Sequence, residues 1–486
     1  MAERLCGATL ARLPAGTARP GYDRGAVRPG IVHLGVGAFH RAHQAAYTDA
    51  VLAAGDGRWG ITAASLRSPD TRDALAPQDG LYALNIRGEA DRLAVIGSIG
   101  RVLAAPEEPA ALLDALCAPT VAIVSLTVTE KAYCRDPASG ALDEAHPDIL
   151  HDLSHPHAPR SALGWLAAAV ARRRAEGLPA FTVLCCDNLP ANGRTLRRLL
   201  ARFAQLRSPG LGAFVEGEVA CPDTMVDRIV PATTDEDRGR VAAALGLWDA
   251  WPVIAEPFTQ WVVADRFPAG RPAWEDAGVT LVADVAPFES MKLRLLNASH
   301  SALAYLGFLA GVETVADAMR DPGLAVFAAR VMDDAVPTLA VPPGTDVAGY
   351  KRALLERFRN PALRHRLAQI AADGSQKLPQ RVLDTMRDRL ALGLPVDTQA
   401  LVVAGWMRYV TGMDERGKPM DVQDPAASGL AAAVQAAGPE ADRLAPALLD
   451  MRPIFGTLGQ DPRARSAVTA ALARLHALGA RRAVLS

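Results

Sequence analysis

Lys292, Asn297 and His300 form the most informative group of polar residues in the sequence. They lie in a leucine-rich stretch, residues 289–309, that we expect to be a single helix with Glu289 near the positive end of its dipole. At about 100° per residue, Lys292, His300 and Asn297 fall at about 0°, 80° and 140° on the helical wheel, and Glu289 falls at about 60°. Four polar side chains are therefore predicted to share one arc of an otherwise apolar helix.

This set of side chains suits the oxidation of a secondary alcohol. A lysine whose pKa is lowered to ~7–8 by burial can accept the hydroxyl proton as hydride leaves the carbon. The amide of Asn297 can donate to the developing alkoxide without titrating, and His300 can orient the same oxygen or a neighbouring hydroxyl. A solvated helix face that carries a lysine and an asparagine is the alternative interpretation of the same spacing.

A second candidate site follows the first apolar run, residues 30–34. Gly35 and Gly37 come directly after this expected strand, and residues 39–53 are expected to form a helix. Glycines in such a turn let the backbone approach the pyrophosphate of a dinucleotide, which then meets the free N–H groups of the helix. His40 stands where the third glycine of the usual motif would be, and an ordinary strand-to-helix turn remains the alternative.

The type of dinucleotide depends on the end of the second expected strand, residues 59–66. An acidic residue there would bind the ribose hydroxyls of NAD, whereas an arginine can accommodate the 2′-phosphate of NADP. Arg67 occupies this position, and Asp70 follows three residues later. The residues alone therefore leave both cofactors open.

Two further strands are expected at residues 121–126 and 180–185, with helical stretches between the strands. This alternation predicts an α/β fold with a largely parallel sheet, whose ligands bind at the carboxyl ends of the strands. Asn188 offers a second amide at one such end, although it could equally cap the turn formed by residues 187–190.

The character of the chain changes near residue 286, after which it is expected to be almost entirely helical. We therefore predict a Rossmann-type dinucleotide-binding domain with insertions over residues 1–285 and a mainly α-helical substrate-binding and catalytic domain over residues 286–486. Besides residues 289–309, the expected helices of the second domain are residues 322–335, 346–358, 362–372, 378–392, 397–410 and 464–479.

Bulk composition favours a small-molecule partner. The 486 residues are 50% apolar and 22% charged, with a formal net charge of -1, which is typical of a globular protein. This balance predicts no binding to nucleic acid or to an anionic membrane. No apolar run approaches the roughly 20 residues that span a bilayer, and the N-terminus lacks the apolar core of a secretory signal. We expect a cytoplasmic protein with free cysteines, and a monomer is compatible with the sequence.

Metal chemistry is not expected. His40 and His43 could present two imidazoles on one helical turn, but a zinc site needs further ligands that the sequence does not supply nearby. The histidines between residues 146 and 157 lie in a proline-containing stretch that we expect to be a solvated loop.

Several blocks together resemble the mannitol dehydrogenase family of polyol-specific long-chain dehydrogenases, over nearly the whole chain. The cofactor turn of this family is similar to Gly35-Val36-Gly37-Ala38-Phe39 and the residues that follow, and its catalytic signature is similar to Lys292, Asn297 and His300. Three further blocks resemble the family at residues 125–131, 186–189 and 225–231.

The resemblance implies roles for individual residues. Lys292 would be the general base, Asn188 and Asn297 would form an oxyanion hole, and His300 would contact the substrate oxygen. Residues 35–39 would bind NAD without a metal ion. Asp227, Arg228 and Lys377 would lie among the substrate-binding groups. A binding protein that senses nucleotides is the alternative from another class, and the general base argues against it.

Within the family, residues 373–381 look most like fructuronate reductases, also called D-mannonate oxidoreductases. Residues 127–131, 256–258 and 405–409 point the same way. Mannitol 2-dehydrogenases carry an arginine where Gln369 stands here. The resemblance therefore predicts the interconversion of D-mannonate and D-fructuronate, with a mannitol, arabinitol or sorbitol dehydrogenase as the alternative.

Overall fold

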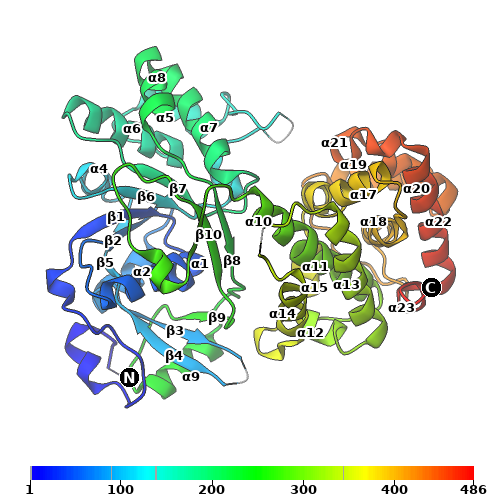
Figure 1. The fold of residues 1–486 in the computed structure, drawn as a ribbon, viewed down its shortest axis with the longest axis horizontal. Coiled ribbons are helices and arrows are strands. Elements are labelled where there is room, and N and C mark those ends of the chain that lie inside the picture. Colours follow the sequence, from blue (N-terminus) through cyan, green and yellow to red (C-terminus); the bar gives the residue numbers. More distant parts are fainter. Residues whose placement is uncertain (1–2, 89, 137–138, 343) are drawn as a thin grey trace. The chain divides into compact units, whose positions relative to one another are not determined.

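The computed structural model describes residues 3–88, 90–136, 139–342 and 344–486. The chain divides into two compact units, Met1–Val285 and Ala286–Ser486 (Figure 1). The first is built around parallel strands and the second is helical, as the sequence predicts.

The first unit is organised by a five-stranded parallel sheet with the order β5-β2-β1-β6-β7 (Figure 1). Its strands are β1 (Pro29–Leu34), β2 (Gly60–Ser65), β5 (Ile99–Ala104), β6 (Ile123–Leu126) and β7 (Thr182–Cys185). The chain runs outward in one direction from β1 and then returns to pair β6 on its other side. This reversal opens a crevice at the carboxyl ends of β1 and β6, which is where ligands bind in such sheets.

Helices cover both faces of this sheet, so its strands are apolar almost throughout. Val32 and Leu34 of β1 join the core beneath α4 (Pro109–Cys117), α6 (Ala162–Ala175) and α7 (Asn192–Arg207). Ile31 faces the other way, into the core beneath α1 (Ala38–Ala42) and α2 (Gln44–Ala53). The remaining helices of this unit are α3 (Asp70–Leu75), α5 (Pro147–Ser154), α8 (Pro209–Glu218) and α9 (Asp235–Leu245).

Two small mixed sheets flank the parallel one and were not predicted. One has the order β4-β3-β9, from β3 (Tyr82–Ile86), β4 (Arg92–Ile96) and β9 (Val253–Ala255). The other has the order β11-β10-β8, from β8 (Thr224–Asp227), β10 (Gln260–Ala264) and β11 (Thr280–Val282). Strands of three to five residues leave little periodicity to detect, and these sheets join segments far apart in sequence.

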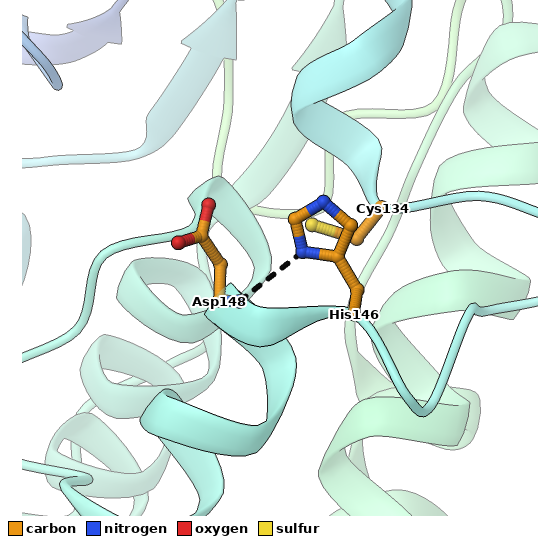
Figure 2. A group of neighbouring side chains, drawn as sticks. All are labelled: Cys134, His146 and Asp148. Atoms are coloured by element: carbon orange, nitrogen blue, oxygen red, sulfur yellow. Dashed lines mark hydrogen bonds between the residues drawn. The ribbon is translucent and has the colours of Figure 1, made fainter.

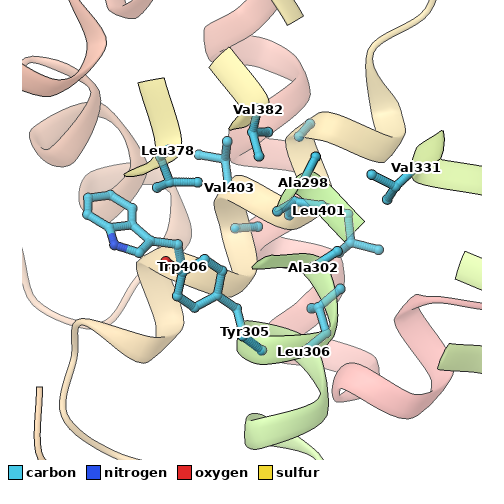
Figure 3. Close-up of a cluster of buried hydrophobic side chains, with 14 of the residues drawn as sticks. Ala298, Ala302, Tyr305, Leu306, Val331, Leu378, Val382, Leu401, Val403 and Trp406 are labelled. Atoms are coloured by element: carbon cyan, nitrogen blue, oxygen red, sulfur yellow. The ribbon is translucent and has the colours of Figure 1, made fainter. Parts of the chain in front are cut away.

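The second unit packs its helices around α18 (Asp397–Tyr409), in which nearly every residue is buried. Figure 3 shows Trp406 and Val403 of α18 among apolar side chains of neighbouring helices. The larger of these neighbours are α13 (Pro322–Ala335), α14 (Val347–Arg359), α17 (Asp384–Ala391), α19 (Ala427–Ala437), α20 (Ala441–Leu449) and α22 (Pro462–Leu478). Shorter helices are α12 (Val315–Ala318), α15 (Leu367–Ala371), α16 (Gly374–Leu378), α21 (Arg452–Phe455) and α23 (Ala480–Ala483). None of the described helices is long and apolar enough to cross a bilayer.

The prediction of one regular α-helix over residues 289–309 is wrong. The segment is helical, but α-helical and π-helical turns alternate along it. The segment runs as α10 (Ala286–Met291), a π-helix η6 (Lys292–Asn297), α11 (Ala298–Ala302) and a second π-helix η7 (Leu303–Gly307). The hydroxyl of Ser299 lies within hydrogen-bond distance of the carbonyl oxygens of Leu295 (2.5 Å) and Leu296 (3.0 Å). A side chain therefore donates to the backbone at the junction of η6 and α11.

The helix expected over residues 378–392 is likewise divided, into α16, a π-helix η10 (Pro379–Leu383) and α17. Pro379 has no N–H to donate to the preceding turn, which explains why the regular α-helical bonding changes at this residue.

Gly374 allows α16 to begin against the core of the second unit. A Cβ at this position would lie 2.4 Å from Nε1 of Trp406 and 2.7 Å from the hydroxyl of Tyr305. Both side chains are buried, so neither can move aside cheaply.

We expect Gly374→Ala to destabilise the second unit by about 1–3 kcal/mol through overpacking. Gly429→Ala in α19 is the matched control, because its Cβ would meet no atom closer than 3.9 Å and alanine favours a helix by about 0.5–1 kcal/mol. Thermal unfolding followed by circular dichroism compares the two. A Gly374 variant as stable as the wild type would contradict this packing argument.

Candidate active site

A cavity of 340 Å³ lies in the first unit, where β1, β2 and β6 end. Most of the residues that line it come from the predicted glycine turn, from the end of β2 and the chain after it, from the chain after β6 and from the start of α6. They include Gly35, Val36, Gly37, Ser65, Leu66, Arg67, Ser68, Asp70, Thr127, Val128, Arg160 and Ser161. This is the crevice that the strand order creates.

The two glycines of the turn have different roles. Gly35 has φ +94°, and a Cβ there would lie 2.2 Å from the carbonyl oxygen of Thr127. Gly35 therefore permits the turn after β1 to touch the turn after β6. A Cβ on Gly37 would meet nothing closer than 3.9 Å, so this glycine leaves room in the cavity for a ligand to reach the backbone.

Two buried histidines, His33 and His40, pack next to the turn. The ring of His33 lies between Ser125 and Thr127, with Nδ1 2.8 Å from one hydroxyl and Nε2 2.9 Å from the other. His40 stacks on His33 with 3.3 Å between the ring centroids. Burial lowers the pKa of His33 to about 3 and that of His40 well below its usual value, so both rings are neutral at pH 7. The missing third glycine is thus replaced by a packed imidazole.

His40 and His43 make different contacts. His40 stacks on His33, whereas Nε2 of His43 lies 3.0 Å from the carbonyl oxygen of Gln260. The helix is also broken between α1 and α2, because His43 has the non-helical angles φ -123° and ψ -97°. The spacing of these two histidines serves packing and hydrogen bonding.

Cys134, His146 and Asp148 form a cluster whose potential metal-binding atoms lie within 4.8 Å of one another (Figure 2). Nδ1 of His146 accepts a hydrogen bond from the backbone N–H of Asp148 (3.2 Å), which caps α5. The carboxylate of Asp148 pairs with Arg67 at 2.8 Å. Burial raises the pKa of the Cys134 thiol to about 12. These contacts form a helix cap with an ion pair. The solvated loop expected between residues 146 and 157 is wrong for most of this stretch, because α5 occupies it.

Asp187 holds the other side of the crevice, and sequence reasoning did not assign it a role. Its carboxylate accepts hydrogen bonds from the N–H groups of Val128 (2.9 Å) and Thr129 (3.0 Å) and from the hydroxyl of Tyr133 (2.7 Å). Thr129 has φ +72°, an unfavourable conformation that these bonds stabilise. The position of an acid directly after β7 was the available signal. The neighbouring Asn188 is exposed.

In the second unit, η6 changes the geometry of the predicted catalytic arc. Hydrogen bonds in a π-helix join residues five apart, as between the N–H of Ala298 and the carbonyl of Leu293. Lys292 and Asn297 are five apart and therefore lie on a similar side, instead of the 140° separation of an α-helix. Lys292 is 8% exposed and Asn297 is half-buried. π-Helical turns within α-helices are frequent at functional sites.

His300 follows in α11 and is 6% exposed. Its ring stacks on Phe358 at 4.2 Å between centroids, and its Nε2 has no hydrogen-bond partner among the residues that the structure describes. Burial lowers the pKa of His300 well below its usual value, and His365, Arg357 and Arg381 lower it further. His300 is thus a neutral ring with an uncommitted nitrogen, in a cationic environment.

The remaining predicted residues divide between the units. Asp227 ends β8 and is buried. Arg228 follows it, and its guanidinium donates to the backbone carbonyls of Ala42 and Glu256, so its predicted role with substrate stays a prediction. Lys377, in α16 of the second unit, donates to the carbonyl of Ala372 at 2.7 Å and lies 3.7 Å from the carboxylate of Asp373.

Comparison with known proteins gives two family matches, which together cover most of the chain. Residues 29–276 match the mannitol dehydrogenase Rossmann domain, and residues 284–476 match the mannitol dehydrogenase C-terminal domain. The chain belongs to the mannitol dehydrogenase family. It is an oxidoreductase that acts on a CH–OH group, as predicted.

Curated relatives from Escherichia coli K12 match almost the whole chain. D-mannonate oxidoreductase is 48% identical over 475 residues, which cover 96% of this chain and 97% of the relative. Uncharacterized oxidoreductase YeiQ is 46% identical over 479 residues, covering 98% of both. Among solved structures, the ternary complex of Pseudomonas fluorescens mannitol 2-dehydrogenase with NAD and D-mannitol is 41% identical, with a TM-score of 0.89 and 99% of each chain covered.

Alanine substitutions at the two glycines of the turn are expected to affect different properties, stability at Gly35 and cofactor binding at Gly37. Gly35→Ala would place Cβ against fixed backbone and should lower the melting temperature or prevent folding. Gly37→Ala should fold normally yet weaken NADH binding by about tenfold or more, because its methyl group enters the cavity. Thermal unfolding and NADH fluorescence titration measure these effects. Normal NADH affinity in a folded Gly37→Ala protein would count against this cavity as the cofactor site.

Proposed function

We propose that this protein is an NAD-dependent oxidoreductase that interconverts D-mannonate and D-fructuronate. The observation that carries this substrate class is the set of cations around His300. Burial is the main cause of the lowered pKa of His300, and the charges of Arg357 and Arg381 add to it. Burial likewise lowers the pKa of the neighbouring His365 to about 4, with a further contribution from Lys377.

A cationic environment matters because a sugar acid carries a carboxylate that a polyol lacks. Taking a carboxylate out of water is unfavourable unless a cation pairs with it. Arg357 is buried, and Arg381 donates to the hydroxyl of the buried Ser301 at 3.2 Å, so both guanidinium groups are held within the fold. The 48% identity to D-mannonate oxidoreductase supports the same substrate.

The cofactor assignment rests on the first unit. The crevice between β1 and β6, the open face of Gly37 and the family match to a Rossmann domain fit a dinucleotide. The neighbour of TM-score 0.89 is described in complex with NAD, which supports NAD here. When bound, NAD supplies the hydride acceptor.

The side chains then move the proton and stabilise the oxygen. In the direction of oxidation, Lys292 takes the proton from the substrate hydroxyl as the carbinol carbon loses hydride. The amides of Asn188 and Asn297 donate to the oxygen while it carries negative charge. The uncommitted Nε2 of His300 contacts the same oxygen as a neutral group, and Asp227 and Lys377 are among the other substrate-binding groups.

The second candidate is a mannitol 2-dehydrogenase or a related arabinitol or sorbitol dehydrogenase. The mannitol 2-dehydrogenase structure supports it through its overall similarity. The exposed Gln369 in α15, where mannitol 2-dehydrogenases carry an arginine, favours the sugar acid instead.

Lys292→Ala should lower kcat by about 10²–10⁴-fold, because the substrate proton then has no base. NADH affinity should stay nearly unchanged, since Lys292 is not among the residues that line the cofactor cavity. Lys418→Ala, at an exposed lysine of the second unit, is the control. Near-normal turnover of the Lys292 variant would remove this residue from the mechanism.

Fructuronate should be reduced with a higher kcat/KM than fructose. Arg381→Gln and Lys377→Met should each reduce kcat/KM for fructuronate more than for the neutral ketose, because each removes a cation. Arg387→Gln provides a control at an exposed arginine of α17. Steady-state kinetics with both ketoses decide the matter, and a preference for fructose would support the polyol dehydrogenase.

A further inference from the structure

Arg67 has the chemistry to recognise NADP, yet the structure engages it elsewhere. It lines the dinucleotide cavity just after β2, where an arginine can accommodate a 2′-phosphate. Its guanidinium Nη2 lies 2.8 Å from Oδ2 of Asp148, a residue of α5. We propose that Asp148 selects NAD over NADP by holding Arg67, an inference that rests on the dinucleotide site of the proposed function.

Asp148 is the better fixed partner of this ion pair. Its side chain is 14% exposed, whereas that of Arg67 is 70% exposed. Asp148 lies in the first turn of α5, where the helix dipole stabilises a negative charge. Its backbone N–H donates to the ring of His146, which fixes the start of the helix (Figure 2). The position of Asp148 therefore determines where Arg67 rests.

The charges at this end of the cavity oppose a 2′-phosphate. Arg67 is accompanied by two carboxylates, Asp148 as its partner and Asp70 in the lining of the cavity. A 2′-phosphate that paired with Arg67 would have to separate it from Asp148 and would then lie beside an unpaired carboxylate. The 2′-hydroxyl of NAD meets no such repulsion and can donate to a carboxylate such as Asp70.

Asp148→Asn tests the proposal, because it removes the charge and keeps the shape. We expect NADPH affinity to rise about 2–5-fold, the upper part of the range that exposed charge interactions produce. NADH affinity should change less than twofold. Asp114→Asn is the matched control, since Asp114 in α4 pairs with Arg172 at 2.7 Å and does not line the cavity.

Arg67→Gln provides an independent test that does not depend on the folding of the Asp148 variant. In the wild-type background it should change NADPH affinity by less than about twofold, because Arg67 is already engaged. In the Asp148→Asn background it should abolish the gain, since the released guanidinium is the group that binds the phosphate. Fluorescence titration of the full-length protein with NADH and NADPH gives all these affinities without a substrate.

Two results would overturn this proposal while leaving the dinucleotide site in place. One is a folded Asp148→Asn protein whose ratio of NADPH to NADH affinity equals that of the Asp114→Asn control. The other is a large loss of NADPH affinity on Arg67→Gln alone, which would mean that Asp148 does not restrain the arginine. Failure of the sugar-acid assignment is separate, since it would appear only in turnover. A wild-type protein that binds neither cofactor would overturn both the dinucleotide site and this proposal.

Discussion

The close approach of two turns at Gly35 is the constraint on which the first unit depends. Gly35 touches the carbonyl of Thr127 at a distance that leaves no space for a side chain. This contact brings the ends of β1 and β6 together and so defines the crevice. His33 of β1 bonds to Ser125 of β6 and to Thr127 just after it, and the carboxylate of Asp187 accepts a hydrogen bond from the chain after β6. The cavity is consequently shaped by buried hydrogen bonds and by the absence of one Cβ.

Burial also controls charge in both units. His33 and His300 are neutral because the protein interior disfavours imidazolium, and in each case desolvation is the main cause of the lowered pKa. The consequences differ because the surroundings differ. Both ring nitrogens of His33 have hydroxyl partners, and the ring stabilises a turn. Nε2 of His300 has no hydrogen-bond partner among the described residues, and two arginines lie near the ring. The same physical effect thus yields a structural group in one unit and a candidate substrate contact in the other.

The family relationship and the local charges answer different questions. High identity to an oxidoreductase that acts on a sugar acid and to one that acts on a polyol establishes the reaction class but leaves the substrate to individual side chains. In the proposed function, Arg357 and Arg381 near His300 supply the charge that would distinguish an acid from a neutral polyol. At the cofactor, the residue type of Arg67 likewise leaves NAD and NADP open. Its effect on cofactor choice depends on the ion pair that it forms with Asp148 in the folded protein.

The sequence by itself determined the α/β class, the glycine turn, the helical nature of the second part and the family, because these depend on local periodicity and contiguous motifs. It could not place His33 against Thr127 or Asp148 against Arg67, since these pairs join residues about 80 or more positions apart. Nor could it predict η6, because a helical wheel assumes the α-helical period, and the backbone hydrogen bonds of this segment follow the π-helical one. Tertiary structure decided these features, since packing and side-chain hydrogen bonds select among backbone states that local sequence leaves close in energy.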